Sequence, residues 1–153
     1  MSKINFKLEG VDEATRKFND LNLFSRQEIV RQTAKSSLKI EGEAKKEIVV
    51  DVGRARASIQ TRFEDGGLTG IIFSDVEYSK WIEFGRPAGK QPPTEALEGW
   101  ARRHGLQGLE FGIARVIGER GLPPKPFLLP AFEGEKKNYI KEVESILKRL
   151  SDK

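Results

Sequence analysis

Residues 58–64 alternate apolar and polar side chains, residues 68–74 contain the apolar run Ile71-Ile72-Phe73, and Asp65-Gly66-Gly67 lies between the two segments. Alternation with a period of two is typical of a strand with one buried face, and adjacent glycines permit the positive φ angles of a tight turn. The sequence therefore predicts an antiparallel hairpin, with Ile72 on one of its faces. The opposite face is expected to carry five side chains drawn from both strands: Ile59, Thr61, Phe63, Ile71 and Phe73.

A long helix is expected before the hairpin. Ser25 and Glu28 have the spacing of a capping box, in which the two side chains satisfy backbone N–H groups of the first turn. The β-branched run 48–50 and then Gly53 mark the C-terminal end of this helix. Its buried stripe is expected to be thin, with six small or apolar residues at helical spacing: Ile29, Thr33, Ser37, Ile40, Ala44 and Ile48.

The two ends of the chain show the same two patterns, the alternation of a strand and the spacing of a helix. Residues 4–8 alternate like a strand, Asp12 can cap a short helix after it, and Pro130 fits the first turn of a final helix. Three shorter helical segments are expected between the hairpin and the final helix, at residues 78–84, 94–105 and 109–121.

Strands and helices are therefore segregated along the chain rather than alternating, which predicts an α+β fold. Its small antiparallel sheet would combine the N-terminal strand with the hairpin near 58–74, packed with long helices. A length of 153 residues fits one domain, so we expect residues 1–153 to form a single unit.

Cysteine is absent, and His104 is the only histidine. Disulfides, thiolate metal sites and cysteine nucleophiles are thereby excluded, and a Ser-His-Asp site would have to use His104. That residue lies at a polar helix end, where a cation is favourable for the helix dipole. The carboxylates form no tight cluster for a metal ion. We therefore expect no enzymatic activity, no cofactor and no metal site.

No segment approaches the run of about 20 apolar residues that crosses a bilayer, and the N-terminus lacks the apolar core of a signal peptide. We expect synthesis in the cytoplasm and no membrane partner. The net charge of +4 permits contact with nucleic acid without requiring it. Four basic residues are candidates for lining a DNA path: Arg86, Lys90, Arg102 and Arg103.

Residues 78–85 and 123–131 carry more aromatic and proline residues than a core alone requires. Aromatic side chains supply contact area at low entropic cost, and prolines fix the direction of the chain before it meets a partner. Glu83, among aromatic neighbours, is expected to point to water or to pair with a cation. Nine residues are the candidates for a subunit or partner interface: Tyr78, Trp81, Glu83, Phe84, Gly85, Pro126, Phe127, Leu128 and Pro130. We expect three of them to pack near Phe127 and Leu128, within the chain or across a subunit boundary: Tyr78, Trp81 and Phe84.

Three segments together resemble a known family. Residues 51–59, DVGRARASI, resemble the V-D-T-G-x-L-R-x-S-I box of the HK-ninety-seven-type phage morphogenesis family, the gene product ten family. Residues 78–85, YSKWIEFG, are similar to its Y-A-x-Y-V-E-F-G-T box, and residues 126–131, PFLLPA, to its P-F-L-x-P-A box. The boxes occur in the family's order, and the resemblance spans about residues 25–150. Departures include Ala55 in place of leucine and Arg86 in place of threonine.

The resemblance implies a structural virion protein of the head–tail junction, a head–tail joining or tail-completion protein of a long-tailed phage or prophage. Such proteins form rings, commonly of about six copies, through which DNA passes, and a ring of identical subunits needs two different contact patches on each copy. The partners implied are other copies of the chain, head-completion proteins, tail-tube or tail-terminator proteins and, transiently, phage DNA. The location implied is the virion neck, with assembly in the host cytoplasm. Two alternatives stay open: a DNA-binding regulator that uses basic helices, and an enzyme such as a nuclease or hydrolase.

Overall fold

The computed structural model describes residues 4–8 and 23–151, with the side chains of residues 25–149. The short helix expected after Asp12 lies outside the described residues. The elements follow in this order: β1 (Ile4–Leu8), α2 (Leu23–Glu47), α3 (Arg54–Ala57), β2 (Ile59–Glu64), the 3-10 helix η1 (Asp65–Gly67), β3 (Thr69–Ser74), α4 (Ser79–Phe84), α5 (Glu95–Arg103), α6 (Glu110–Arg120) and α7 (Leu128–Ser151).

The three strands form one antiparallel sheet in the order β1-β3-β2, so β3 is central. The α+β class and the sheet built from the N-terminal strand and the hairpin are confirmed. The hairpin turn also lies where the sequence predicts it, because Gly66 and Gly67 both take positive φ angles.

The predicted arrangement of the hairpin faces is wrong. Residues that lie directly opposite in an antiparallel pair share a face, and Thr61 lies opposite Ile72 while Ile59 lies opposite Ser74. Ile72 is therefore on the same face as Ile59, and both are completely buried. Residues 65–68 separate the paired Glu64 and Thr69, and the length of this connection sets a register that alternation alone does not fix.

Ile71 and Phe73 lie on the other face of the sheet. The Arg62 guanidinium lies 5.6 Å from the centre of the Phe73 ring, within the range of a cation–π contact. This face of β2 is exposed at Gln60 and Arg62. The helices therefore cover one face of the sheet.

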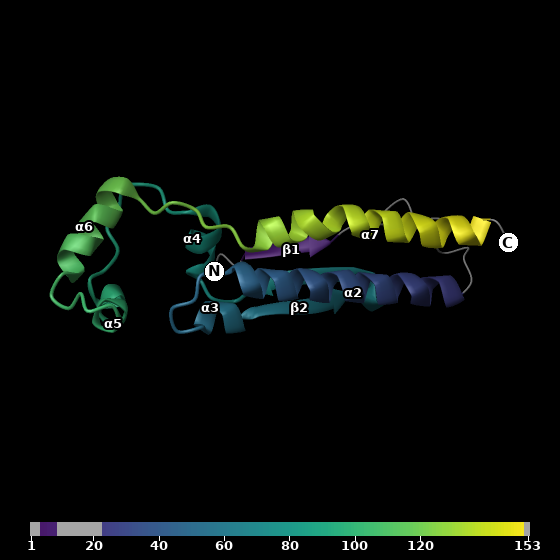
Figure 1. Cartoon of the computed structure of the whole chain (residues 1–153), viewed down its shortest axis with the longest axis horizontal. Helices are drawn as coiled ribbons and strands as arrows, with labels where there is room; N and C mark the ends of the chain where they lie inside the picture. Colours follow the sequence, from purple (N-terminus) through teal and green to yellow (C-terminus); the bar gives the residue numbers. More distant parts are fainter. Residues whose placement is uncertain (1–3, 9–22, 152–153) are drawn as a thin grey trace.

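Helices α2 and α7 run antiparallel along the length of the sheet (Figure 1). The predicted stripe of α2 is confirmed, because all six of its residues are buried. Packing against the sheet is close at Ser37, whose Oγ would lie only 2.0 Å from a Cβ atom added to Gly70. A glycine in β3 is what allows α2 to approach the strand so nearly.

The capping box predicted at Ser25 is wrong. Helix α2 begins at Leu23, so Ser25 is already within it, and the buried Ser25 hydroxyl finds no hydrogen-bond partner among the described residues. The Glu28 carboxylate does not reach back to the start of the helix, because it accepts a hydrogen bond from Arg149 of α7 at 3.4 Å. A contact with another helix thus replaces the local one.

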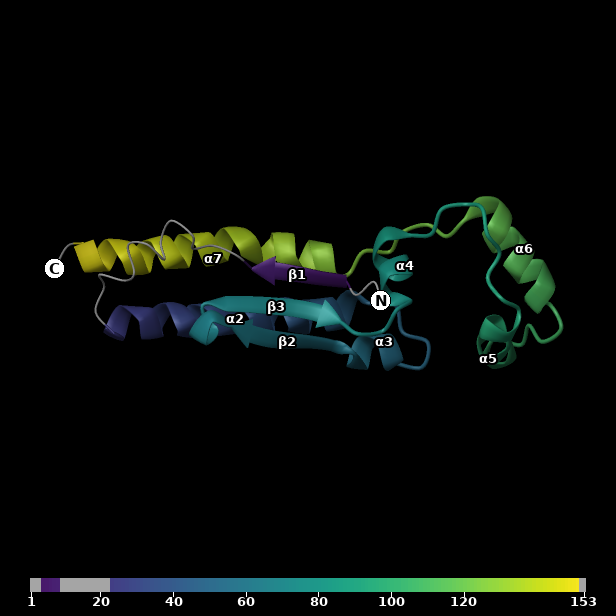
Figure 2. The same cartoon turned by 180° about the vertical axis from the view of Figure 1, so that it is seen from behind.

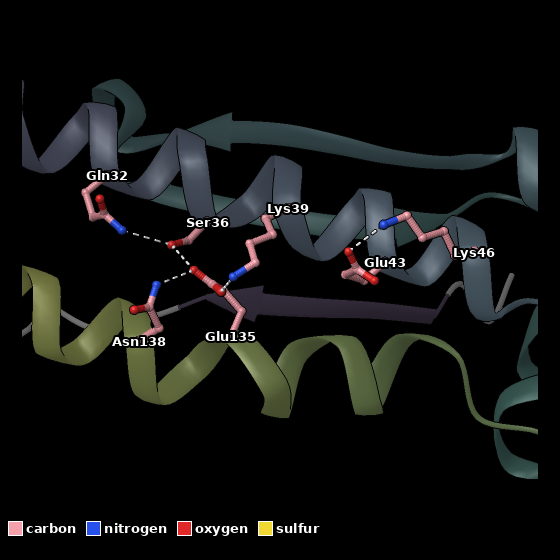
Figure 3. Close-up of polar contacts among 7 residues, drawn as sticks. All are labelled: Gln32, Ser36, Lys39, Glu43, Lys46, Glu135 and Asn138. Atoms are coloured by element: carbon pink, nitrogen blue, oxygen red, sulfur yellow. Dashed lines mark hydrogen bonds and ion pairs between the residues drawn. The ribbon is translucent and has the colours of Figure 1, made fainter.

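The interface between α2 and α7 is partly polar. Figure 3 shows the Glu135 carboxylate of α7 accepting hydrogen bonds from Ser36 at 2.9 Å and Asn138 at 3.0 Å, and from Lys39. A second bond between the helices joins the hydroxyls of Thr33 and Tyr139 at 3.1 Å. These pairs fix how α2 and α7 are aligned along their length, which apolar contacts alone specify less well.

Helices α5 and α6 lie beyond one end of the sheet, apart from the other elements (Figures 1 and 2). We call these two helices, with the extended segments 86–94 and 121–127 that join them to the rest, the arm. The body comprises the sheet with α2, α3, α4 and α7. Where the arm leaves the body, Arg86 and Leu122 exchange backbone hydrogen bonds of 2.9 and 2.8 Å. Within the part of the chain that the structure describes, no helix is both long and apolar enough to cross a membrane.

Candidate functional site

Helix α4 lies at the end of the body from which the arm departs (Figure 2). It has two turns at most, because Gly85 ends it with φ 72° and ψ 179°, a conformation open essentially to glycine alone. Ser79 and Glu83 form its buried side. The stop at Gly85 confirms the short helix that the sequence predicts.

The buried Glu83 carboxylate binds the N-terminus of α7. Its oxygens accept hydrogen bonds from the backbone N–H groups of Phe127, Leu128 and Leu129 at 2.8, 2.9 and 2.8 Å. The first N–H groups of a helix have no partner within the helix and carry a partial positive charge, so a carboxylate there is doubly favourable. The prediction that Glu83 points to water or pairs with a cation is therefore wrong: the helix N-terminus takes the place of the cation.

A chain of three serine hydroxyls binds the other end of α4. Ser58 donates to the Ala55 carbonyl at 2.7 Å, which leaves its oxygen to accept from Ser74 at 2.7 Å. Ser74 then accepts from Ser79 of α4 at 2.6 Å. All three serines are buried. Helix α4 is thus fixed to the turn before β2, to the end of β3 and to α7.

The backbone after α4 packs closely on the returning segment of the arm. A Cβ atom on Gly85 would lie 2.6 Å from the Leu122 carbonyl oxygen and 2.8 Å from the Pro124 nitrogen. The Lys125 N–H donates to the Ile82 carbonyl at 2.7 Å. A side chain at residue 85 would separate these two segments.

The opposite side of α4 exposes three aromatic side chains, Tyr78 at 42%, Trp81 at 37% and Phe84 at 62%. We call this surface the α4 face. The Lys80 ammonium lies 4.8 Å from the centre of the Trp81 ring, and the Arg86 guanidinium lies 5.6 Å from it. The α4 face therefore combines large apolar side chains with two cations, and its backbone is held in place by Glu83 and Ser79.

The other interface candidates divide by burial. Phe127 and Leu128 belong to the core and are completely buried, so they present no surface to a neighbouring molecule in this conformation. Pro126 and Pro130 are exposed on either side of them. The two segments that the sequence singled out do meet, through the Glu83 carboxylate and the backbone of residues 127–129.

The four basic candidates lie in the arm. Arg86 donates to the Lys90 carbonyl at 2.7 Å in addition to its position over Trp81. Arg102 and Arg103 lie at the C-terminal end of α5, and Arg103 binds the Asp51 carboxylate of the body, with Nε 3.1 Å from Oδ1. These hydrogen bonds from Arg103 hold the pKa of Asp51 below its usual range. Asp51 and Arg103 thereby tie the arm to the loop before α3.

The arm also contains a cleft of about 650 Å³ between α5 and the start of α6. Phe111, 66% exposed, forms part of its wall. Three carboxylates, from Glu95, Glu98 and Glu110, line the cleft with a single guanidinium, from Arg102. We call this hollow the arm cleft, and its lining is predominantly acidic.

His104 lies at the C-terminal end of α5, as the sequence predicts. Its ring stacks on Trp100 with 4.5 Å between centroids, and Nδ1 lies 2.9 Å from the Trp100 carbonyl oxygen. Across residues 4–8 and 23–151, no three His, Asp or Glu side chains gather as a metal site needs.

Sequence reasoning missed the cap that Glu83 provides and the arm cleft. A signal for the cap was present, because the chain entering the final helix reads Lys125-Pro126-Phe127 and offers none of the side chains that usually cap a helix. A cap from elsewhere in the chain was therefore needed. The cleft had no comparable signal, since its carboxylates come from two helices. No protein-family model, curated protein or solved structure matches this chain.

Proposed function

We propose that this chain is a structural, non-enzymatic subunit of a tailed-phage particle, built into a ring at the neck where the tail joins the head. The ring aligns the two parts and leaves a hole through which DNA passes. It contains about six copies, and its neighbours are the head-completion and tail-tube or tail-terminator proteins. The protein therefore acts in the virion and is assembled in the host cytoplasm.

The observation that carries the proposal is the convergence of the three boxes that resemble the phage family. Ser58 of the first box is linked through Ser74 to Ser79 of the second. Glu83 of the second box binds the backbone of the third at Phe127 and Leu128. Glu83, Phe127 and Leu128 match their boxes in type and bind one another, which supports a shared structural role for the second and third boxes.

A second support is the apolar surface left over at the same end of the body. Trp81 and Phe84 of the second box are exposed there, and the valines at residues 49, 50 and 52 in the loop before α3 are all more than half exposed. Aromatic side chains are enriched at the buried centres of protein interfaces. A subunit whose neighbours cover this end accounts for that exposure.

The proposal is tested by the absolute mass of the purified protein over a series of concentrations, measured by light scattering, together with electron microscopy of the largest species. We expect closed rings of about six copies that bind purified phage tails lacking their neck. A compact dimer that binds duplex DNA with a steep salt dependence would instead support a regulator.

The Trp81→Ala variant connects the assay to the α4 face. It is expected to keep its fold, judged by circular dichroism, and to lose ring formation. Phe63→Ala is the matched control, because Phe63 is an aromatic of similar exposure on the sheet. Rings that form equally well from both variants would remove the α4 face from the interface.

A further inference from the structure

The arm has almost no core of its own. The residues that its two helices bury completely or nearly so are Ala101, Ala114 and Gly118, which contribute little apolar area. Three large side chains at its two helices remain in solvent: Leu109, Phe111 and Val116. Two short helices that bury so little are marginal alone, so the arm gains most of its stability from what it packs against.

Its own body covers little of it. The hydrogen bonds between the arm and the body run from the Lys125 N–H to the Ile82 carbonyl at 2.7 Å, from the Phe127 N–H to the Glu83 carboxylate at 2.8 Å, and from Arg103 to Asp51 at an exposed position. None of these contacts involves Phe111 or the carboxylates of the arm cleft. The cleft is therefore available to another molecule.

The chemistry of the arm cleft is complementary to that of the α4 face. The cleft has an apolar wall at Phe111 and a net negative lining from three carboxylates and one guanidinium. The α4 face presents aromatic rings and two cations, Lys80 and Arg86. Among the described residues, the carboxylate that pairs with Lys80 is that of Glu77, at the long distance of 3.8 Å, so the Lys80 charge remains open to a further partner. Opposite charges around an apolar centre are the usual arrangement of a specific contact.

We propose that the arm cleft of one copy receives the α4 face of a second copy of this chain. The inference rests on the proposed function in that the two copies are neighbours in the ring. One copy contributes the cleft and the next contributes the face, so the contact is heterologous and repeats around a closed ring. Trp81 and Phe84 enter the cleft beside Phe111, and Lys80 and Arg86 meet Glu95 and Glu98.

A second copy is the occupant rather than the same chain, because the arm is already tied to a different surface of its own body. The Arg103–Asp51 pair places the end of α5 beside the loop before α3. The N-terminal half of α5, with Glu95 and Glu98, is left for the neighbour. The α4 face, with its aromatic rings beside Lys80 and Arg86, is a better partner for this half of α5 than the valines of that loop. Tryptophan, tyrosine and arginine dominate the energy of most interfaces.

Cross-linking tests the contact directly, since the chain has no cysteine of its own. Chains with Phe84→Cys alone are mixed with chains with Phe111→Cys alone and treated with a short bis-maleimide. We expect a covalent dimer from the mixture and almost none from either variant by itself. A chain with both substitutions should give a ladder of oligomers in a denaturing gel, and a covalent link confined to single chains would overturn the proposal.

Charge exchange gives an independent test. Glu95→Lys with Glu98→Lys, or Lys80→Glu with Arg86→Glu, is expected to weaken self-association by about tenfold or more, and the chain with all four substitutions should regain it. Glu119→Lys is the control, because it alters the arm's charge outside the cleft. No rescue by the fourfold exchange would contradict the pairing.

The outcomes separate this contact from the proposed function. Rings that form without the cross-link between residues 84 and 111 leave the neck function standing and refute the contact. A cross-link at Val52→Cys in place of Phe84→Cys refutes it too, and makes the loop before α3 the partner surface. Chains that remain monomeric at every concentration and give no cross-link overturn both.

Discussion

Replacing Glu83 with alanine tests whether one carboxylate holds α4 against α7. The side chain is 2% exposed, and its oxygens accept three backbone N–H groups at 2.8 to 2.9 Å. Residues 125–127 supply no side chain that could take over the cap. The substitution therefore leaves the first turn of α7 without acceptors.

The size of the effect follows from which N–H groups water can reach. Leu129 is 40% exposed, so its N–H can be solvated, whereas Phe127 and Leu128 are completely buried. A buried donor left unpaired costs about 1–3 kcal/mol, and loss of the charge at the helix N-terminus adds about 0.3–1 kcal/mol. We expect Glu83→Ala to lower the free energy of unfolding by about 3–5 kcal/mol.

Glu83→Gln keeps one acceptor oxygen and removes the charge. Its amide group turns a donor toward the N–H groups, so we expect a loss of about 2 kcal/mol, roughly half that of alanine. The control is Glu133→Ala, on the exposed side of α7, with an expected change within about 0.5 kcal/mol. The assay is urea unfolding followed by circular dichroism, with the midpoints compared at constant slope.

A loss below about 1 kcal/mol for Glu83→Ala would refute the reasoning, because it would mean that water or another group satisfies the α7 N-terminus. An equal loss from Glu83→Gln and Glu83→Ala would show that the charge, and not the number of acceptors, dominates. The Glu133→Ala control separates the loss of the Glu83 hydrogen bonds from a general effect of removing negative charge near α7.

Three further changes have expected outcomes that unfolding measurements can check. Gly70→Ala brings a Cβ atom to 2.0 Å from Ser37 Oγ and is expected to cost about 2–3 kcal/mol; a second change, Ser37→Ala, should recover part of it because the nearest remaining atom then lies at 3.0 Å. Gly85→Ala combines a positive φ angle with a contact of 2.6 Å to the Leu122 carbonyl, so we expect a loss of about 2–4 kcal/mol together with loss of ring formation. Glu135→Gln should lower stability at pH 7 and reduce its decline in acid. Burial alone would raise the pKa of Glu135, but hydrogen bonds from Lys39, Asn138 and Ser36 outweigh burial and hold that pKa below its ordinary range. The carboxylate therefore stabilises the fold fully above the unfolded value of about 4.3 and loses this contribution as the pH falls through the lower folded value.

Each of these has a contrary result. Additive effects of Gly70→Ala and Ser37→Ala would mean that the sheet moves away from α2 instead of clashing with it. A Gly85→Ala chain that still forms rings would separate α4 packing from assembly. An acid transition unchanged by Glu135→Gln would show that other carboxylates determine it.

Local sequence patterns were sufficient to predict the strands and helices and the positions at which several of them end. The two periods located the three strands and the long helices, and the glycines at 66, 67 and 85 marked a turn and a helix stop where positive φ angles occur. The absence of cysteine and the helix-end position of His104 also followed from the sequence, as did the thin buried stripe of α2. These features depend on neighbours within a few residues, which a sequence records directly.

Tertiary structure decided the contacts between distant segments. Alternation did not fix which face of the hairpin meets α2, and Glu28 pairs with Arg149 of another helix instead of with its own helix start. Glu83 accepts a hydrogen bond from the N–H of Phe127, which is 44 positions further along the chain. The arm cleft exists only because α5 and α6 pack side by side. Local periodicity fixes which side of an element is apolar, but the identity of the group that satisfies a buried carboxylate or a helix end is settled only when the elements pack.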